Sequence, residues 1–299
     1  DGVDLLQKAI DAASGQAQRD LERAHARFLR SVDPRRSLQA TRRLAERDAT
    51  DPAMQIEVLK LPIAWTDCRL IEDTLRRLGA VLSQDSATWK TYEARRLLEC
   101  QGGKADASAA LLLLVPIIQA DPLAVEPRLL AAEANLALGD RRSATMQLFD
   151  YTSRGGRDVR AHLRLTLLLR DEQRWDDANA TLRAALAIEP IAPDIRIQRA
   201  LVAEQAGMID QAKADHALAA AEGMIGADIA MIALAIRQDD PAAASEAARR
   251  LEGWDGKDAG AHEALALYYT AMGDTDRAIG LIEASSVDGV LKPGLFVDV

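Results

Sequence analysis

Apolar residues recur every three to four positions along most of the chain, in segments of about a dozen residues that short polar turns separate. Each segment is long enough for about three turns of helix. Runs of β-branched and aromatic residues are scarce, which argues against a large sheet. The pattern therefore predicts an all-α protein built of antiparallel helix pairs.

A polar turn followed by an alanine near the start of the next helix recurs about every 34 residues. It is found at Gly139 to Ala144, Gln173 to Ala178, Gly207 to Ala212 and Gly273 to Ala278. With this alanine as the twentieth residue, units begin near 125, 159, 193 and 259, and a looser unit begins near 225, with Ala244. The same grid places upstream units near 21, 55 and 89, so the sequence predicts about eight hairpins.

The twentieth position is small because a neighbouring helix must approach closely there. In the upstream units it is occupied by Ala40, Thr74 and Ser108. A leucine follows four residues later, one turn along the same helix face, at Leu44, Leu78 and Leu112. These pairs are expected to pack in the core.

Two prolines fall inside predicted helices. Pro62 removes a backbone donor, at a cost of about 3 kcal/mol in an unbroken helix, so a kink or break is expected at Leu61. Pro116 predicts a similar interruption in the second helix of the unit near 89. Residues 1 to 14 form a further amphipathic pattern, and the tail fits no repeat. The expected organisation is a capping helix at 1–20, divergent repeats at 21–124, better-matching repeats at 125–290 and a tail at 291–299, in one continuous solenoid.

At this level of detail the units resemble the tetratricopeptide repeat family, which has a small residue at position 8, Gly at 15, Ala at 20 and Pro at 32. Position 8 is filled by Ala132, Thr166, Ala200 and Ala266, position 15 by Gly139, Gly207 and Gly273, and position 32 by Pro190. Phe28 and Arg96 depart from the pattern at position 8, and irregular packing is expected near them. The resemblance covers roughly residues 21 to 290. It implies a right-handed α-solenoid of about eight hairpins plus an N-terminal helix.

The resemblance also implies a binding surface, because the first helices of such units line a concave face that holds partner peptides. The predicted binding residues, at positions 2, 5, 9 and 12 together with one neighbouring arginine, are Leu129, Glu133, Leu136, Arg160, Leu163, Arg164, Leu167, Arg170, Ile197, Leu201 and Glu204. The leucines would anchor an apolar segment, and Arg160, Arg164 and Arg170 would pair with its acids. Alternatively, the leucines pack against one another or against the N-terminal helix and bind nothing.

Composition excludes several other classes. The net charge is −9, and residues 201 to 299 hold seventeen acidic against seven basic residues, which disfavours nucleic-acid binding. The longest apolar run, residues 109 to 118, is too short to cross a membrane. The histidines His25, His162, His216 and His262 are scattered and lack a metal-binding spacing. We therefore expect no catalytic site, metal or cofactor.

The two cysteines, Cys68 and Cys100, lie near equivalent positions one unit apart. A disulfide requires Cα atoms within about 7 Å, whereas packed helix axes usually lie about 8–10 Å apart. Spacing therefore favours two free thiols, with a cross-unit disulfide as the alternative.

The leading hypothesis is a non-enzymatic protein–protein interaction scaffold that binds a protein or peptide partner in the apolar groove. One alternative is the targeting module of a longer bacterial glycosyltransferase or sulfotransferase, and another is a periplasmic scaffold for polysaccharide export or pilus assembly. A start at Asp1 without methionine favours a processed or cut chain. The preference for Arg over Lys fits a bacterium, with cytoplasm and periplasm both open.

Overall fold

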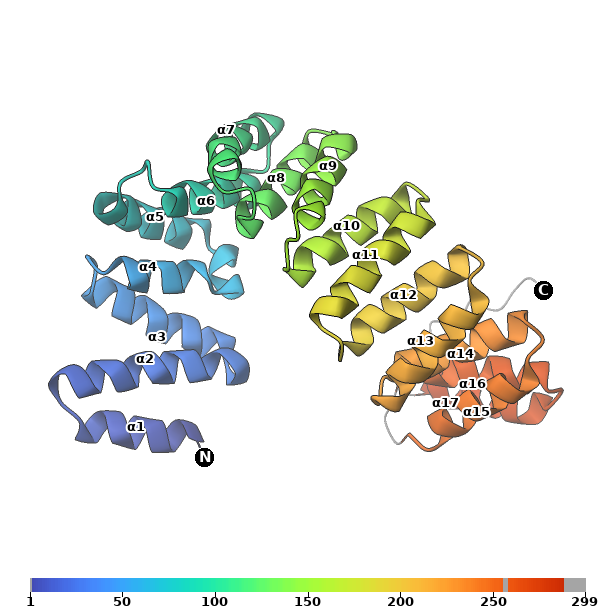
Figure 1. Ribbon diagram of the computed structural model, residues 1–299. Coiled ribbons are helices and arrows are strands. Elements are labelled where there is room, and N and C mark those ends of the chain that lie inside the picture. Colours follow the sequence, from blue (N-terminus) through green and yellow to red (C-terminus); the bar gives the residue numbers. More distant parts are fainter. Residues whose placement is uncertain (1, 255–257, 288–299) are drawn as a thin grey trace. The chain divides into compact units, whose positions relative to one another are not determined.

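The computed structural model describes residues 2–254 and 258–287, and in these ranges it contains seventeen α-helices and no strand (Figure 1). The all-α prediction is therefore confirmed. The chain divides into two compact units, Asp1–Gly156 and Arg157–Val299. The predicted tail at 291–299 lies outside the described residues.

The first unit is a succession of helices, each packed against the next in sequence. Its α-helices are α1 (Gly2–Ala12), α2 (Gly15–Val32), α3 (Pro34–Arg47), α4 (Pro52–Leu59), α5 (Cys68–Leu82), α6 (Ala87–Arg96), α7 (Lys104–Ala120), α8 (Val125–Ala137) and α9 (Arg141–Ser153). A 3₁₀ helix, η1 (Pro62–Thr66), follows α4, and a π-helix, η2 (Leu97–Gln101), follows α6. The predicted additional N-terminal helix is α1, which packs on α2.

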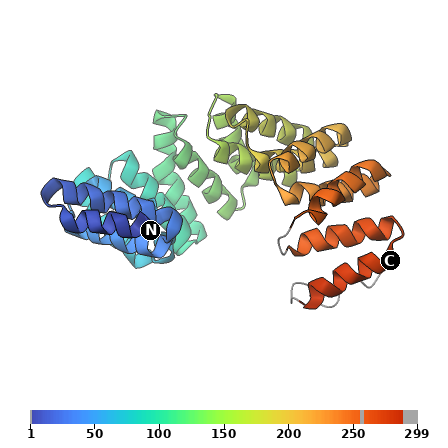
Figure 2. The same ribbon diagram turned by 90° about the horizontal axis from the view of Figure 1, so that it is seen from below.

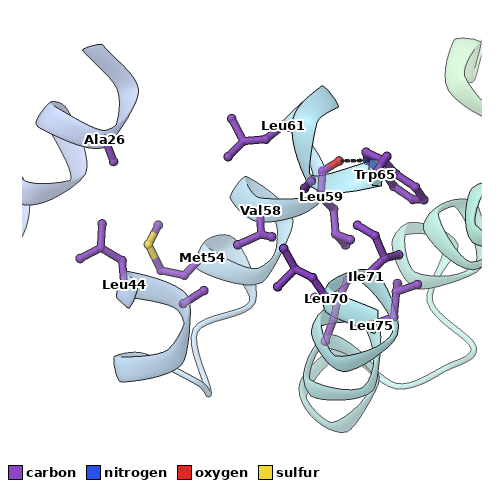
Figure 3. Packing of buried hydrophobic residues seen from close by; sticks show 13 residues of the cluster. Ala26, Leu44, Met54, Val58, Leu59, Leu61, Trp65, Leu70, Ile71 and Leu75 are labelled. Carbon is purple, nitrogen blue, oxygen red and sulfur yellow. Dashed lines mark hydrogen bonds between the residues drawn. The ribbon is translucent and has the colours of Figure 1, made fainter. Parts of the chain in front are cut away.

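A hydrophobic core joins α3, α4, η1 and α5 (Figure 3). Leu59, Ile71 and Leu78 are fully buried in it. The indole Nε1 of Trp65 donates a hydrogen bond of 2.8 Å to the carbonyl oxygen of Leu59, which holds η1 against the end of α4 (Figure 3). Because η1 supplies part of this core, the chain stays packed where its helix is interrupted.

The two prolines behave differently. Helix α4 ends at Leu59 and η1 begins at Pro62, so the predicted break at Leu61 is confirmed. No break occurs at Pro116, because α7 continues through it. Proline has no N–H to donate to the carbonyl oxygen of Leu112, four residues earlier. Because Leu112 and Pro116 are both exposed, this carbonyl lies on the side of α7 that faces water, which can hydrogen-bond it instead.

The third hairpin is shifted by two residues from the sequence grid. Ser108 and Leu112, assigned to the core, are exposed, whereas Ala110 and Leu114 are fully buried. The shift arises before α7, where η2 winds more residues into a turn than an α-helix does and Gly102 adopts a left-handed conformation with φ 72°. The irregularity expected near Arg96 is therefore this π-helix.

In the first repeat, most of the buried positions are shifted by one residue from those that the sequence predicted. Phe28, placed at the small position, is exposed, and the next residue, Leu29, is buried. On α3, Leu44 is buried at position 24 as predicted, but Ala40 at position 20 is only half-buried, and Thr41 and Ala45, one residue further on, are buried as well. The weaker match to the repeat pattern thus reflects a real change of helix phase.

A disulfide joins Cys68 and Cys100, whose Cα atoms are 5.7 Å apart. The expectation of two free thiols was wrong because the usual spacing applies to helix axes, whereas these residues lie at helix ends. Cys68 is the first residue of α5, and Cys100 belongs to η2. The bond therefore connects the second hairpin to the π-helix of the third.

The second unit consists of four regular hairpins. Its helices are α10 (Val159–Asp171), α11 (Trp175–Ile188), α12 (Pro193–Gln205), α13 (Ile209–Ala221), α14 (Ile225–Arg237), α15 (Pro241–Glu252), α16 (Ala259–Ala271) and α17 (Thr275–Val287). Figure 2 shows the C-terminal helices of this unit in orange and red. The predicted unit starts at 125, 159, 193, 225 and 259 coincide with the first residues of α8, α10, α12, α14 and α16.

The small residues of the repeat pattern lie where the helices touch. Position 20 is fully buried at Ala144, Ala178, Ala212 and Ala244, and nearly so at Ala278. Position 8 is buried at Ala132, Thr166, Ala200 and Ala266. Larger side chains at these positions would separate the helices, so these residues set the spacing within both units.

Candidate peptide-binding surface

The predicted binding residues fall in both units. On α8 in the first unit, Glu133 is exposed and Leu129 and Leu136 are half-buried. The other eight lie on α10 and α12 in the second unit. The second unit therefore carries most of the candidate surface.

A leucine at position 9 is exposed on three of the four first helices of the second unit. The exposed fractions are 42% for Leu167 on α10, 38% for Leu201 on α12 and 46% for Leu267 on α16. Leu163 and Ile197, at position 5 of α10 and α12, are half-buried. We call Leu167, Leu201 and Leu267 the leucine series. The sequence analysis missed Leu267, although position 9 of the unit starting at 259 would have identified it.

The predicted arginines differ in their surroundings. Arg160 Nη2 lies 2.9 Å from Asp158 Oδ2, and this carboxylate also caps the start of α10. Burial opposes ionisation of Asp158, but its hydrogen bonds to Arg160 hold its pKa below the ordinary value. Arg164 is half-buried. Within the described ranges, the half-buried Arg170 side chain makes no hydrogen bond or ion pair, so its charge is available to an acidic ligand.

Glu204 is held by two neighbouring helices. Its Oε1 lies 3.0 Å from Nε2 of His216 on α13, and its Oε2 accepts a 2.5 Å bond from Arg237 Nη2 on α14. His216 is fully buried and occupies position 24, where equivalent hairpins carry Leu148 and Leu182. Glu204 thus anchors α12 to α13 and α14, and its charge is already paired.

The described part of the chain contains no group of three His, Cys, Asp or Glu side chains placed to hold a metal ion. None of its helices is long and apolar enough to cross a membrane. A cavity of about 660 Å³ lies among α15, α16 and α17. Its Tyr269 hydroxyl hydrogen-bonds Glu252, and the Arg277 guanidinium lies 5.2 Å from the centre of the tyrosine ring.

From α8 onward, helical hairpins of nearly constant length, small residues at positions 8 and 20, and a short turn at position 15 define the fold as that of tetratricopeptide repeat proteins, as the sequence predicted. No protein-family model matches the chain, and no curated protein matches its sequence.

Three solved structures show the similarity. One is the C-terminal part of a TPR repeat-containing protein from Cytophaga hutchinsonii, with a TM-score of 0.55 and 13% identity over 81% of this chain and 98% of that one. Another is PilW, a widely conserved type IV pilus biogenesis factor, with a TM-score of 0.51 and 14% identity over 69% of this chain and 95% of that one. A third is the Cut9–Hcn1 hetero-tetramer of the APC/C, with a TM-score of 0.50 and 16% identity over 96% of this chain and 57% of that one. At these identities the similarity establishes the fold alone.

Proposed function

We propose that this chain is a non-enzymatic protein-interaction scaffold and that its second unit binds an apolar segment of a partner protein along α10, α12 and α16. The leucine series carries the proposal. Its members lie at the same repeat position and keep 38–46% of their surface exposed. Packing within the second unit thus leaves apolar surface available, which counts against the alternative that these leucines serve only internal packing.

The energy available indicates what else the partner must contribute. Complete burial of a leucine is worth about 2 kcal/mol, so covering the exposed parts of three yields roughly 2–3 kcal/mol. Association costs more than this in lost freedom, so the leucines alone do not hold a complex. An acidic group on the partner that meets Arg170 would add a charge-assisted hydrogen bond. We infer a partner segment that combines apolar side chains with a carboxylate.

A charge substitution in the leucine series tests the proposal. Wild type and the Leu167→Arg, Leu201→Arg variant are used for affinity capture from a lysate of the source organism, with mass spectrometry as the readout. The matched control is Leu218→Arg, because Leu218 is a 50% exposed leucine on α13, a second helix of its hairpin. We expect partners that the control retains and the double variant loses. Equal capture by all three proteins would contradict the proposal.

A periplasmic location of the scaffold is the second candidate, and the disulfide favours it. Structural disulfides persist in oxidising compartments and are rare in the cytoplasm. The Cys68–Cys100 bond therefore supports the periplasmic alternative over a cytoplasmic one. Alkylation of thiols in intact cells before lysis tests this. Full alkylation of both cysteines without added reductant would argue against it.

A further inference from the structure

A second cavity, separate from the leucine series, lies in the first unit among α1, α2 and α3. Its volume is about 320 Å³, at the lower end of the range for small-ligand sites. Ile10, Ala40 and Leu44 provide apolar lining, and Arg43 and Arg47 line it from α3. The cavity thus combines a small apolar space with positive charge.

His25 of α2 also lines this cavity, and it is a polar group without a partner. The residue is only 8% exposed, and its Nε2 atom is buried with no hydrogen-bond partner. Buried polar atoms in native proteins nearly always have such a partner. The His25 ring is part of the cavity lining, so its signals would report a molecule that binds there.

The two arginines are not equivalent. Arg47 Nη1 is 2.7 Å from Glu22 Oε2, so this pair is close to neutral. Arg43 is exposed, and its side chain makes no ion pair or hydrogen bond with any described residue. The cavity lining therefore has one uncompensated positive charge, that of Arg43.

We propose that this cavity binds a monoanionic carboxylate with a small aliphatic body. Arg43 presents a planar guanidinium, which matches the two oxygens of a carboxylate. The apolar lining accommodates a branched aliphatic group. Because Arg47 and Glu22 neutralise each other, the single charge of Arg43 balances one negative charge, which disfavours the more highly charged inorganic phosphate. The carboxylate belongs either to a free aliphatic acid or to the C-terminus of a peptide that ends in an aliphatic residue.

Nuclear magnetic resonance of the full chain tests the proposal through the His25 ring signals, which a His25→Gln variant assigns. The probes are 4-methylpentanoate, an acetylated tetrapeptide ending in leucine, the amide of each compound, and inorganic phosphate. We expect a saturable shift of the His25 signals with one or both carboxylates and none with the amides. Comparison of the affinities of the free acid and the peptide identifies the source of the carboxylate.

Arg43→Gln provides the second measurement, because Arg43 is exposed and its loss should leave the fold intact. We expect carboxylate affinity to fall by about tenfold or more. Arg35→Gln is the matched control, because Arg35 is also exposed on α3 but does not line the cavity. Unsaturable shifts, equal binding of acid and amide, tighter binding of phosphate, or unchanged affinity in Arg43→Gln would each overturn the proposal. None of these results depends on the leucine series.

Discussion

Two ion pairs, each with one buried member, occupy the same repeat positions with their charges exchanged. In the fourth repeat Arg128 Nη2 lies 2.6 Å from Asp150 Oδ2, and in the seventh Asp228 Oδ1 lies 2.7 Å from Arg250 Nε. Both pairs join position 4 to position 26. Arg128 is the buried partner in the first pair and Asp228 in the second. The repeat thus tolerates either charge at position 4 if position 26 supplies the other.

The two aspartates have opposite pKa shifts. Hydrogen bonds from Arg154, and then from Arg128, lower the pKa of Asp150. Burial raises the pKa of Asp228, and the hydrogen bond from Arg250 offsets this only in part. A lowered pKa stabilises the fold above about pH 4 and loses this contribution as the pH falls. A raised pKa stabilises the fold at low pH and loses its contribution as the pH rises.

This difference predicts opposite effects of the same substitution. Asp228→Asn should be at least as stable as wild type at pH 7, because it removes a carboxylate whose ionisation the fold disfavours. Asp150→Asn should be less stable than wild type at pH 7 and approach it as the pH falls below about 4. Urea unfolding of both variants at pH 7 and pH 3 measures the effects. The same sign for both variants at pH 7 would contradict this account.

At the scale of elements, the turn at position 15 has a constant backbone conformation. In the five repeats from the fourth to the eighth, φ is positive, at 84° for Gly139, 57° for Gln173, 74° for Gly207, 53° for Asp239 and 79° for Gly273. Glycine adopts this conformation without steric cost, whereas a glutamine does not. The turn geometry is therefore kept even where the glycine is absent.

Gln173→Gly should consequently stabilise the chain. The substitution relieves a left-handed conformation that costs a non-glycine residue about 1–2 kcal/mol, but it also increases the freedom of the unfolded chain. We expect a net gain of about 0.5 kcal/mol in the free energy of unfolding. Chemical denaturation provides the measurement. Gly207→Gln is the reciprocal control and should destabilise by a similar amount.

The disulfide acts between a regular helix, α5, and the π-helix η2. It ties the start of α5 to η2, next to Arg95, whose guanidinium lies 4.0 Å from the centre of the Trp65 ring. Closing a loop of this kind typically contributes about 2–4 kcal/mol. The bond thus secures the junction where the third hairpin departs from the regular repeat.

Removing the bond should therefore lower the stability of the first unit. We expect Cys68→Ser, Cys100→Ser to lose about 2–4 kcal/mol, and wild type in reductant to lose a similar amount. Thermal unfolding with and without reductant measures this, and thiol titration of denatured, unreduced protein should find no free thiol. The double variant should not respond to reductant. A wild type that is equally insensitive would show that the bond adds no stability.

At the scale of the whole molecule, the cores follow the two units. The cluster that contains Leu114 and Leu130 lies within the first unit and joins α7 to α8. The clusters around Ile232 and Ala200 lie within the second. Because each unit has its own buried core, each has the main requirement for folding alone.

Expression of separate fragments tests this division. Residues 1–156 and 157–299 should each be helical and unfold cooperatively, as circular dichroism during heating would show. Fragments cut between 124 and 125, the repeat boundary expected from the sequence, would separate Leu114 from Leu130 and expose part of that core. We expect these fragments to be less stable or to aggregate. Cooperative folding of 1–124 equal to that of 1–156 would favour the sequence boundary.

The sequence by itself determined the helical hairpins and where those after residue 125 begin, because helix periodicity, small residues and turn residues act locally and repeat with a constant spacing. It also indicated the repeat positions from which the leucine series follows. Only the tertiary structure decided the phase of the third hairpin, the Cys68–Cys100 bond and the surroundings of His25. These features depend on contacts between residues distant in sequence. A shift of one or two residues turns a helix by 100° or more and so changes which side chains meet.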